Sequence, residues 1–157
     1  MIEHWQQHPM GFVHIVVALA ALAFGTAVIF SRKGTRTHRR LGRAYLLMML
    51  ALNGTALAIY ELLGGFGLFH WMALFSLASV LLGYWPAWHR SAGWKVEHAY
   101  FMTGSYVGLI AALVSEVATR TAMVPFFSAV AIASIGVIVV GVWLMRRLVP
   151  GILSGQR

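Results

Sequence analysis

Long apolar runs, separated by short polar or glycine-containing breaks, dominate the chain. Each run is at least about 20 residues long, which is the length an α-helix needs to cross the hydrocarbon core of a bilayer. The pattern therefore predicts an all-α integral membrane protein with five transmembrane helices. The predicted helices cover residues 10–31, 43–63, 66–88, 95–119 and 123–148.

The breaks between the predicted helices are short, and two of them, "GGFG" (residues 64–67) and "RTAM" (residues 120–123), have only four residues each. Connections of this length make consecutive helices antiparallel neighbours. No internal repeat or long linker divides the chain. We therefore expect residues 1–157 to form one transmembrane domain, with the first four helices arranged as an up-down bundle.

Composition supports the membrane class. Of the 157 residues 60% are hydrophobic and only 10% are charged, whereas soluble domains average about 45–50% and about 25%. The start, "MIEHWQQHPM", has no basic segment, so the first apolar run is interpreted as a retained helix and not as a cleaved signal peptide. Cysteine is absent, which excludes thiolate metal sites and disulfides.

The basic residues predict the orientation. Eleven of the twelve Lys and Arg residues fall in the first and third connections or at the C-terminus, and only Arg120 falls elsewhere. The positive-inside rule then places the N-terminus outside and the C-terminus in the cytoplasm, for a multi-pass protein of the inner (cytoplasmic) membrane. The basic loop at 32–43 is expected to bind anionic lipid head groups, and no nucleic-acid partner is expected.

Four ionisable side chains are predicted at one depth near the outer face, each on a different helix. At about 1.5 Å per residue, all four lie about 4–6 Å inside the outer boundary. Ionisable groups in membrane spans are costly and are functional candidates by default. Nitrogen and carboxylate donors suit Zn²⁺ or Fe²⁺, so we expect a metal or metallo-cofactor site, with a redox role as one option, at His14, His70, Glu61 and Glu116.

Three alternatives remain open for this set. His14 and His70, on diagonal helices of a bundle, are also suited to ligate haem b, although no helix carries two histidines at the spacing of a chain of two haems. Proton or ion handling is a second alternative. The third is purely structural, because Glu and His near helix ends often reach the interface or cap a neighbouring helix.

Further polar residues lie deeper or on the cytoplasmic side. His38 and His98, at the starts of two helices, are candidates for binding a metal, a quinone head group or a haem propionate. Asn53 and Tyr60 in the second helix, and Ser105 in the fourth, form polar stripes. These stripes are typical of hydrogen bonds between helices, and a proton path is the alternative.

The last predicted helix carries small residues and no ionisable group up to residue 145. It is a candidate surface for a membrane-protein partner or a second copy of the chain. This favours a second hypothesis, a non-catalytic accessory subunit or assembly factor of a larger complex. No nucleophile–base pair or phosphate loop assigns an enzyme class, and transport gains little support without a repeat.

Two motifs resemble a known family. "HRRLGRAY" (residues 38–45) opens the second predicted helix, and "HAYFMTGSY" (residues 98–106) opens the fourth. Both are similar to signatures of an uncharacterised family of small bacterial polytopic membrane proteins, classed as a domain of unknown function. The resemblance covers about residues 10–120 and implies no established activity. It adds weight to His38 and His98 as functional residues.

Overall fold

The computed structural model of the protein describes residues 9–60, 64–121 and 123–155. Within these residues the chain forms five α-helices and no strand, which confirms the predicted fold class. Each helix is long and apolar enough to cross a membrane. The helices are α2 (Pro9–Phe30), α3 (Arg36–Ala58), α4 (Leu68–His89), α5 (Trp94–Thr121) and α6 (Phe126–Leu153).

Helix α3 differs most from its predicted range, because it begins seven residues earlier, at Arg36. Hydropathy cannot mark this start, since the first turns are basic. The Thr35 side chain instead accepts a hydrogen bond from the His38 backbone N–H and caps the helix. The helix ends at Ala58, where Ile59 is extended, so Tyr60 lies after the helix and not within it.

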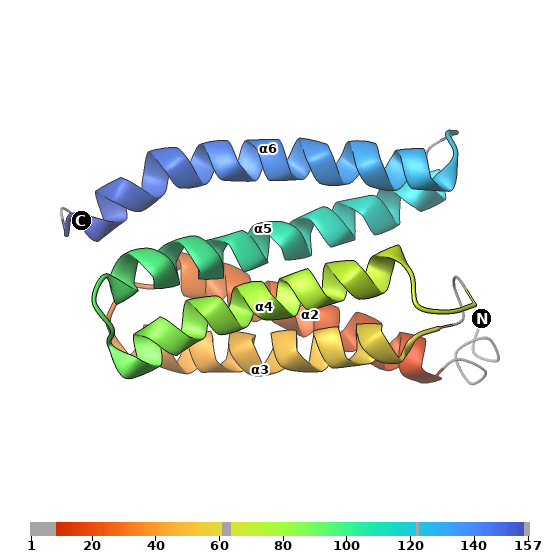
Figure 1. The fold of residues 1–157 in the computed structure, drawn as a ribbon. Coiled ribbons are helices and arrows are strands. Elements are labelled where there is room, and N and C mark those ends of the chain that lie inside the picture. The colour runs from red at the N-terminus through yellow and green to blue at the C-terminus, as the bar shows by residue number, and fades with distance from the viewer. Residues whose placement is uncertain (1–8, 61–63, 122, 156–157) are drawn as a thin grey trace. The chain divides into compact units, whose positions relative to one another are not determined.

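The chain divides into two compact units, Met1–Ala78 and Ser79–Arg157. The first contains α2, α3 and the beginning of α4. Helices α2 and α3 run antiparallel and side by side (Figure 1). The fully buried Ala21 of α2 and the almost fully buried Tyr45 and Met49 of α3 belong to the core of this unit, so α2 packs closely through the small side chain of Ala21.

The second unit contains the rest of α4 with α5 and α6, and α5 and α6 form its antiparallel pair (Figure 1). Two glycines permit close approach. A Cβ on Gly83 of α4 would lie 2.9 Å from the Met102 Sδ of α5, and one on Gly141 of α6 would collide with Val107. The buried Ser115 and Ser134 hydroxyls, 2.9 Å apart, add a polar bond between α5 and α6.

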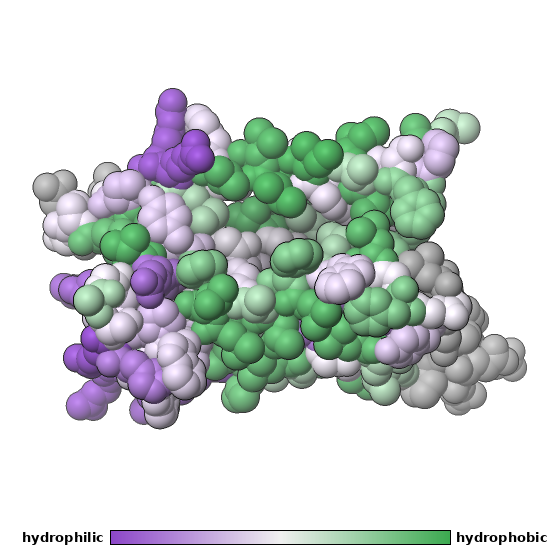
Figure 2. Space-filling view, viewed as in Figure 1, coloured by the Kyte–Doolittle hydropathy of each residue, from purple (hydrophilic) through white to green (hydrophobic). Residues whose placement is uncertain are grey.

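Large apolar side chains cover the exterior of the helices. Figure 2 shows hydrophobic residues over the middle of the helices in view and strongly hydrophilic residues gathered at one end, on the left. On α6, Ile132, Val139 and Trp143 are each at least half exposed, and Arg147 lies 4.4 Å from the Trp143 ring. Such a surface suits lipid, and the orientation across the membrane stays the prediction made from the basic residues.

Candidate functional site

His14 of α2 is oriented by the last turn of α3. Its Nδ1 lies 2.9 Å from the Thr55 hydroxyl oxygen, and that hydroxyl donates its own hydrogen to the Leu52 carbonyl at 2.9 Å. Because a hydroxyl has one hydrogen, Thr55 accepts from His14, and Nδ1 carries the proton. In the neutral ring the lone pair is therefore on Nε2.

His38, in the first turn of α3, has the same arrangement at the opposite end of the helix pair. Its Nδ1 lies 3.1 Å from the Ser31 hydroxyl, which donates to the Val28 carbonyl at 2.8 Å. Ser31 thus accepts from the Nδ1–H of His38. The neutral imidazole again carries its lone pair on Nε2.

His98, in the first turns of α5, reaches back to α4 within the second unit. Its Nδ1 lies 2.9 Å from the Gly83 carbonyl oxygen, and since a carbonyl can only accept, Nδ1–H donates. The absent side chain of Gly83 is what lets α5 come close enough, as the Met102 contact shows. This ring is the third with its lone pair on Nε2.

His70 of α4 has the opposite tautomer. The Gly67 N–H donates to His70 Nδ1 at 3.1 Å, while the His70 and Trp71 N–H groups donate to the Gly67 carbonyl. His70 therefore takes the place of the Glu or Gln in a capping box at the start of α4. With Nδ1 accepting, the neutral ring carries its proton on Nε2.

The Nε2 of His70 is buried, and it has no hydrogen-bond partner within the described part of the chain. Only 3% of the residue is exposed. An unsatisfied buried donor costs about 1–3 kcal/mol, and such groups are rare in native proteins. The predicted equivalence of His14 and His70 as ligands is therefore not matched by their hydrogen bonding, although both lie near the C-terminal end of α3.

The carboxylates of the predicted outer set are placed differently. Glu116 lies on the exposed surface of α5, where Arg120 Nε donates to it at 2.9 Å and Nη2 donates as well. Glu61 falls outside the described residues. Across residues 9–60, 64–121 and 123–155, no three His, Asp or Glu side chains gather in a way that could hold a metal ion. The four-ligand centre stays a prediction.

Two residues of the polar stripes donate hydrogen bonds to carbonyls of their own helices. Asn53 Nδ2 donates to the Met49 carbonyl at 2.7 Å, and Ser105 donates to the Met102 carbonyl at 2.8 Å. Tyr60 instead packs on His70, with the ring centroids 4.7 Å apart. The sequence reasoning missed Thr55, Ser31 and Gly83, whose only sequence indication is a small or hydroxyl residue near a helix end.

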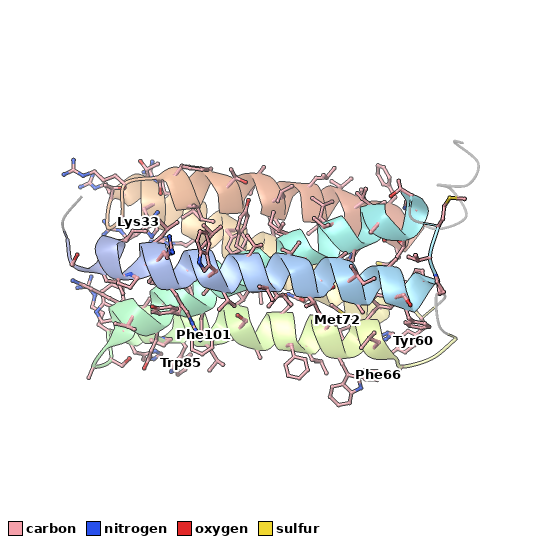
Figure 3. All side chains as sticks on the ribbon, turned by 90° about the horizontal axis from the view of Figure 1, so that it is seen from above. Lys33, Tyr60, Phe66, Met72, Trp85 and Phe101 are labelled. Atoms are coloured by element: carbon pink, nitrogen blue, oxygen red, sulfur yellow. The ribbon has the colours of Figure 1, made fainter. Side chains whose placement is uncertain are left out.

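The two ends of the first unit also differ in charge. Lys33 follows α2 and donates to the Val28 and Ile29 carbonyls at the end of that helix and to the Ser31 carbonyl just after it. Partial desolvation lowers the pKa of Lys33 from its usual 10.5. In Figure 3, Lys33 marks one end of the helices, and Tyr60 and Phe66 mark the other. His38 belongs to the basic end, and His14 and His70 to the aromatic end.

Residues 11–154 match the family described as "Predicted membrane protein (DUF2306)". The chain belongs to this family. The match confirms the resemblance indicated by the two motifs and extends it through α6. No curated protein and no solved structure matches the chain significantly. Members of this family are membrane proteins of unknown function, so a function has to be inferred from the histidines themselves.

Proposed function

We propose that the protein is a membrane redox protein that binds haem b, with His14 and His38 of the first unit and His98 of the second as separate candidate axial ligands through Nε2. The observation that carries this proposal is the shared tautomer of the three rings, each fixed by an acceptor at Nδ1. Histidines that ligate metals almost always donate their other N–H to a fixed oxygen acceptor, which sets the tautomer and the ring orientation.

The number of ligands favours haem over a bare ion. A bare Zn²⁺ or Fe²⁺ site takes three or four protein donors, and the described residues, which do not include Glu61, show no group of three. Haem iron needs only axial ligands from the protein, because the porphyrin supplies the others. The Glu116 carboxylate is also engaged by Arg120, which makes it a weaker candidate ligand.

Charge supports the same assignment around His38. All six Lys and Arg residues of the first unit lie between residues 32 and 43, and Arg36 and Arg39 flank His38 in the first turns of α3. Guanidinium groups bind carboxylates well, and haem carries two propionates. The predicted topology places His38 and His98 at the cytoplasmic face and His14 at the outer face. When bound, haem supplies one-electron chemistry; the helices hold it and exclude water.

An absorption spectrum of the purified protein tests the proposal. The protein is produced in cells supplied with 5-aminolevulinate, extracted in mild detergent, and examined before and after reduction with dithionite. We expect a Soret band and a reduced-minus-oxidised α band, with haem quantified as the pyridine haemochrome. His14→Ala, His38→Ala and His98→Ala should each lower the haem content or change these bands.

His89→Ala is the matched control for these variants. Like the three candidate ligands, His89 has an oxygen acceptor at Nδ1, the Trp85 carbonyl at 3.1 Å. Unlike them, it bonds its own helix and is exposed. It should leave the spectrum unchanged. Protein without haem, or haem content unchanged by all three substitutions, contradicts the proposal.

Metal analysis of the same sample separates the other hypotheses. Stoichiometric zinc or iron without a Soret band would support the bare-ion centre of His14, His70, Glu61 and Glu116. A sample with no cofactor that co-purifies with a stoichiometric membrane partner would support an accessory subunit.

A further inference from the structure

His70 presents a buried hydrogen-bond donor that the haem proposal does not use. Its Nδ1 accepts from the Gly67 N–H, so the proton of the neutral ring is on Nε2. That atom has no partner among residues 9–60, 64–121 and 123–155. The residue is only 3% exposed. The donor therefore needs an acceptor, and the described residues do not provide one.

Aromatic rings surround this donor. The Phe66 ring stacks on the imidazole with centroids 4.8 Å apart and planes at 27°, and the Tyr60 ring lies 4.7 Å away on a 38° tilt. Trp71 meets Phe66 edge to face at 5.4 Å. The three aromatic side chains are about half exposed, and Figure 3 shows Tyr60 and Phe66 together at one end of the helices.

The segment that carries Phe66 can move its ring without breaking a helix. Phe66 stands between Gly65 and Gly67, before the first residue of α4, and Gly64 has a φ of +66°. Glycine gives such a segment wide conformational freedom. Displacing the Phe66 ring from the imidazole would uncover His70 on the side where about half of the Phe66 surface is already exposed.

Charge limits the kind of acceptor. Every Lys and Arg of residues 1–78 lies between 32 and 43, at the end of the α2–α3 pair opposite to His70. An anion at His70 would have no basic side chain of this unit to offset its burial, which is costly. The acceptor that fits is therefore a neutral carbonyl oxygen.

We propose that His70, with Phe66 and Tyr60, binds the head group of a membrane quinone. The Nε2–H donates to one quinone carbonyl, and the aromatic rings pack against the flat quinone ring. A quinone is neutral, planar and dissolved in the bilayer, so it suits the donor, the rings and an end of the first unit that has no basic side chain. This site stands on residues that the haem proposal does not use, and it does not depend on haem.

Binding of decylubiquinone to the full chain in lipid nanodiscs tests this inference. Isothermal titration should show one site per chain. His70→Phe keeps an aromatic ring but removes the donor, and it should weaken binding about three- to tenfold, as expected for one buried hydrogen bond. His70→Gln restores an N–H donor near the Nε2 position and should recover part of the affinity.

His89→Phe is the matched control, because His89 lies on the same helix and packs against a ring, that of Trp85, at 4.1 Å. It should bind decylubiquinone as the parent does. Nitrogen-15 spectra of labelled histidine should show the Nε2–H tautomer for one buried ring, and added decylubiquinone should shift that signal only. This readout does not require any variant to fold.

Three results would overturn the inference. One is the absence of decylubiquinone binding, and another is equal affinity in the parent and His70→Phe. The third is a His70 signal that responds to Glu61→Gln but not to decylubiquinone, which would assign the acceptor to the chain itself. A parent protein that binds decylubiquinone but contains no haem would overturn the proposed function and leave this inference intact.

Discussion

The α2–α3 pair and the α5–α6 pair are both antiparallel, yet polar side chains have different roles in them. In the first pair, Thr55 and Ser31 accept hydrogen bonds from imidazoles and thereby fix where the proton lies. In the second, the polar contact joins two hydroxyls, Ser115 and Ser134. The first arrangement sets up chemistry, and the second only holds helices together.

This difference separates stability from function within one small membrane protein. Small residues allow close approach in both pairs, through Ala21 in the first and Gly141 in the second. In the first pair, close packing is combined with imidazoles that bond across the pair: His14 of α2 to Thr55 of α3, and His38 of α3 to Ser31 after α2. Substitutions at the packing contacts between α5 and α6 should therefore affect folding alone, whereas substitutions at Thr55 or Ser31 should affect cofactor binding.

The largest effect is expected from Gly141→Leu. The new side chain would be driven into Val107 of α5, and overpacking of this kind costs about 2–3 kcal/mol. Unfolding of the detergent-solubilised protein by SDS titration measures the loss. Gly136→Leu on the same helix is the control, because no atom lies within 4 Å of a Cβ there. Equal losses in the two variants would show that Gly141 is not a packing contact.

Thr55→Val tests whether the first pair orients a ligand. Valine keeps the shape but removes the acceptor of the His14 Nδ1–H, and losing such a partner typically weakens metal or cofactor binding about 10–100-fold. Haem titration of the apoprotein measures this. Thr119→Val is the control, since Thr119 also donates to the carbonyl three residues back but lies on α5, in the other helix pair. A parent-like haem affinity in Thr55→Val would argue against a ligand role for His14.

Thr35→Ala removes the side-chain cap of α3. Its hydroxyl accepts from the His38 N–H at 3.2 Å, and losing an N-cap costs about 1 kcal/mol. We expect lower stability in the SDS titration, together with faster amide exchange confined to the first turn of α3. Unchanged exchange at His38 would mean that the basic turn does not depend on this cap.

The smallest effect is expected from the Ser115–Ser134 pair. A double-mutant cycle with Ser115→Ala and Ser134→Ala should give a coupling energy of about 0.6 kcal/mol, as is usual for hydrogen bonds between membrane helices. Neither variant should alter the haem spectrum or decylubiquinone binding. A spectral change in either one would remove the distinction between the two helix pairs.

Hydrophobic periodicity predicted the five helices because apolar runs of bilayer length have few alternatives. It misplaced the start of α3, where the cap at Thr35 and not hydropathy decides the boundary. The sequence also identified His14, His38, His70 and His98 as exceptional, since each is an ionisable group in or beside an apolar helix. It grouped His14 with His70 and His38 with His98 by their depth, but composition and spacing could not show which nitrogen of each ring is hydrogen-bonded.

The sequence by itself thus determined the membrane class, the helix count and the residues that need an explanation. Only the tertiary structure decided which nitrogen of each imidazole carries the proton. Thr55 lies 41 positions from His14, and Gly83 lies 15 from His98. Hydrogen bonds over such separations depend on the register of the packed helices and on the distance between them. A local sequence pattern does not determine either. That geometry distinguishes three candidate ligands from one buried donor.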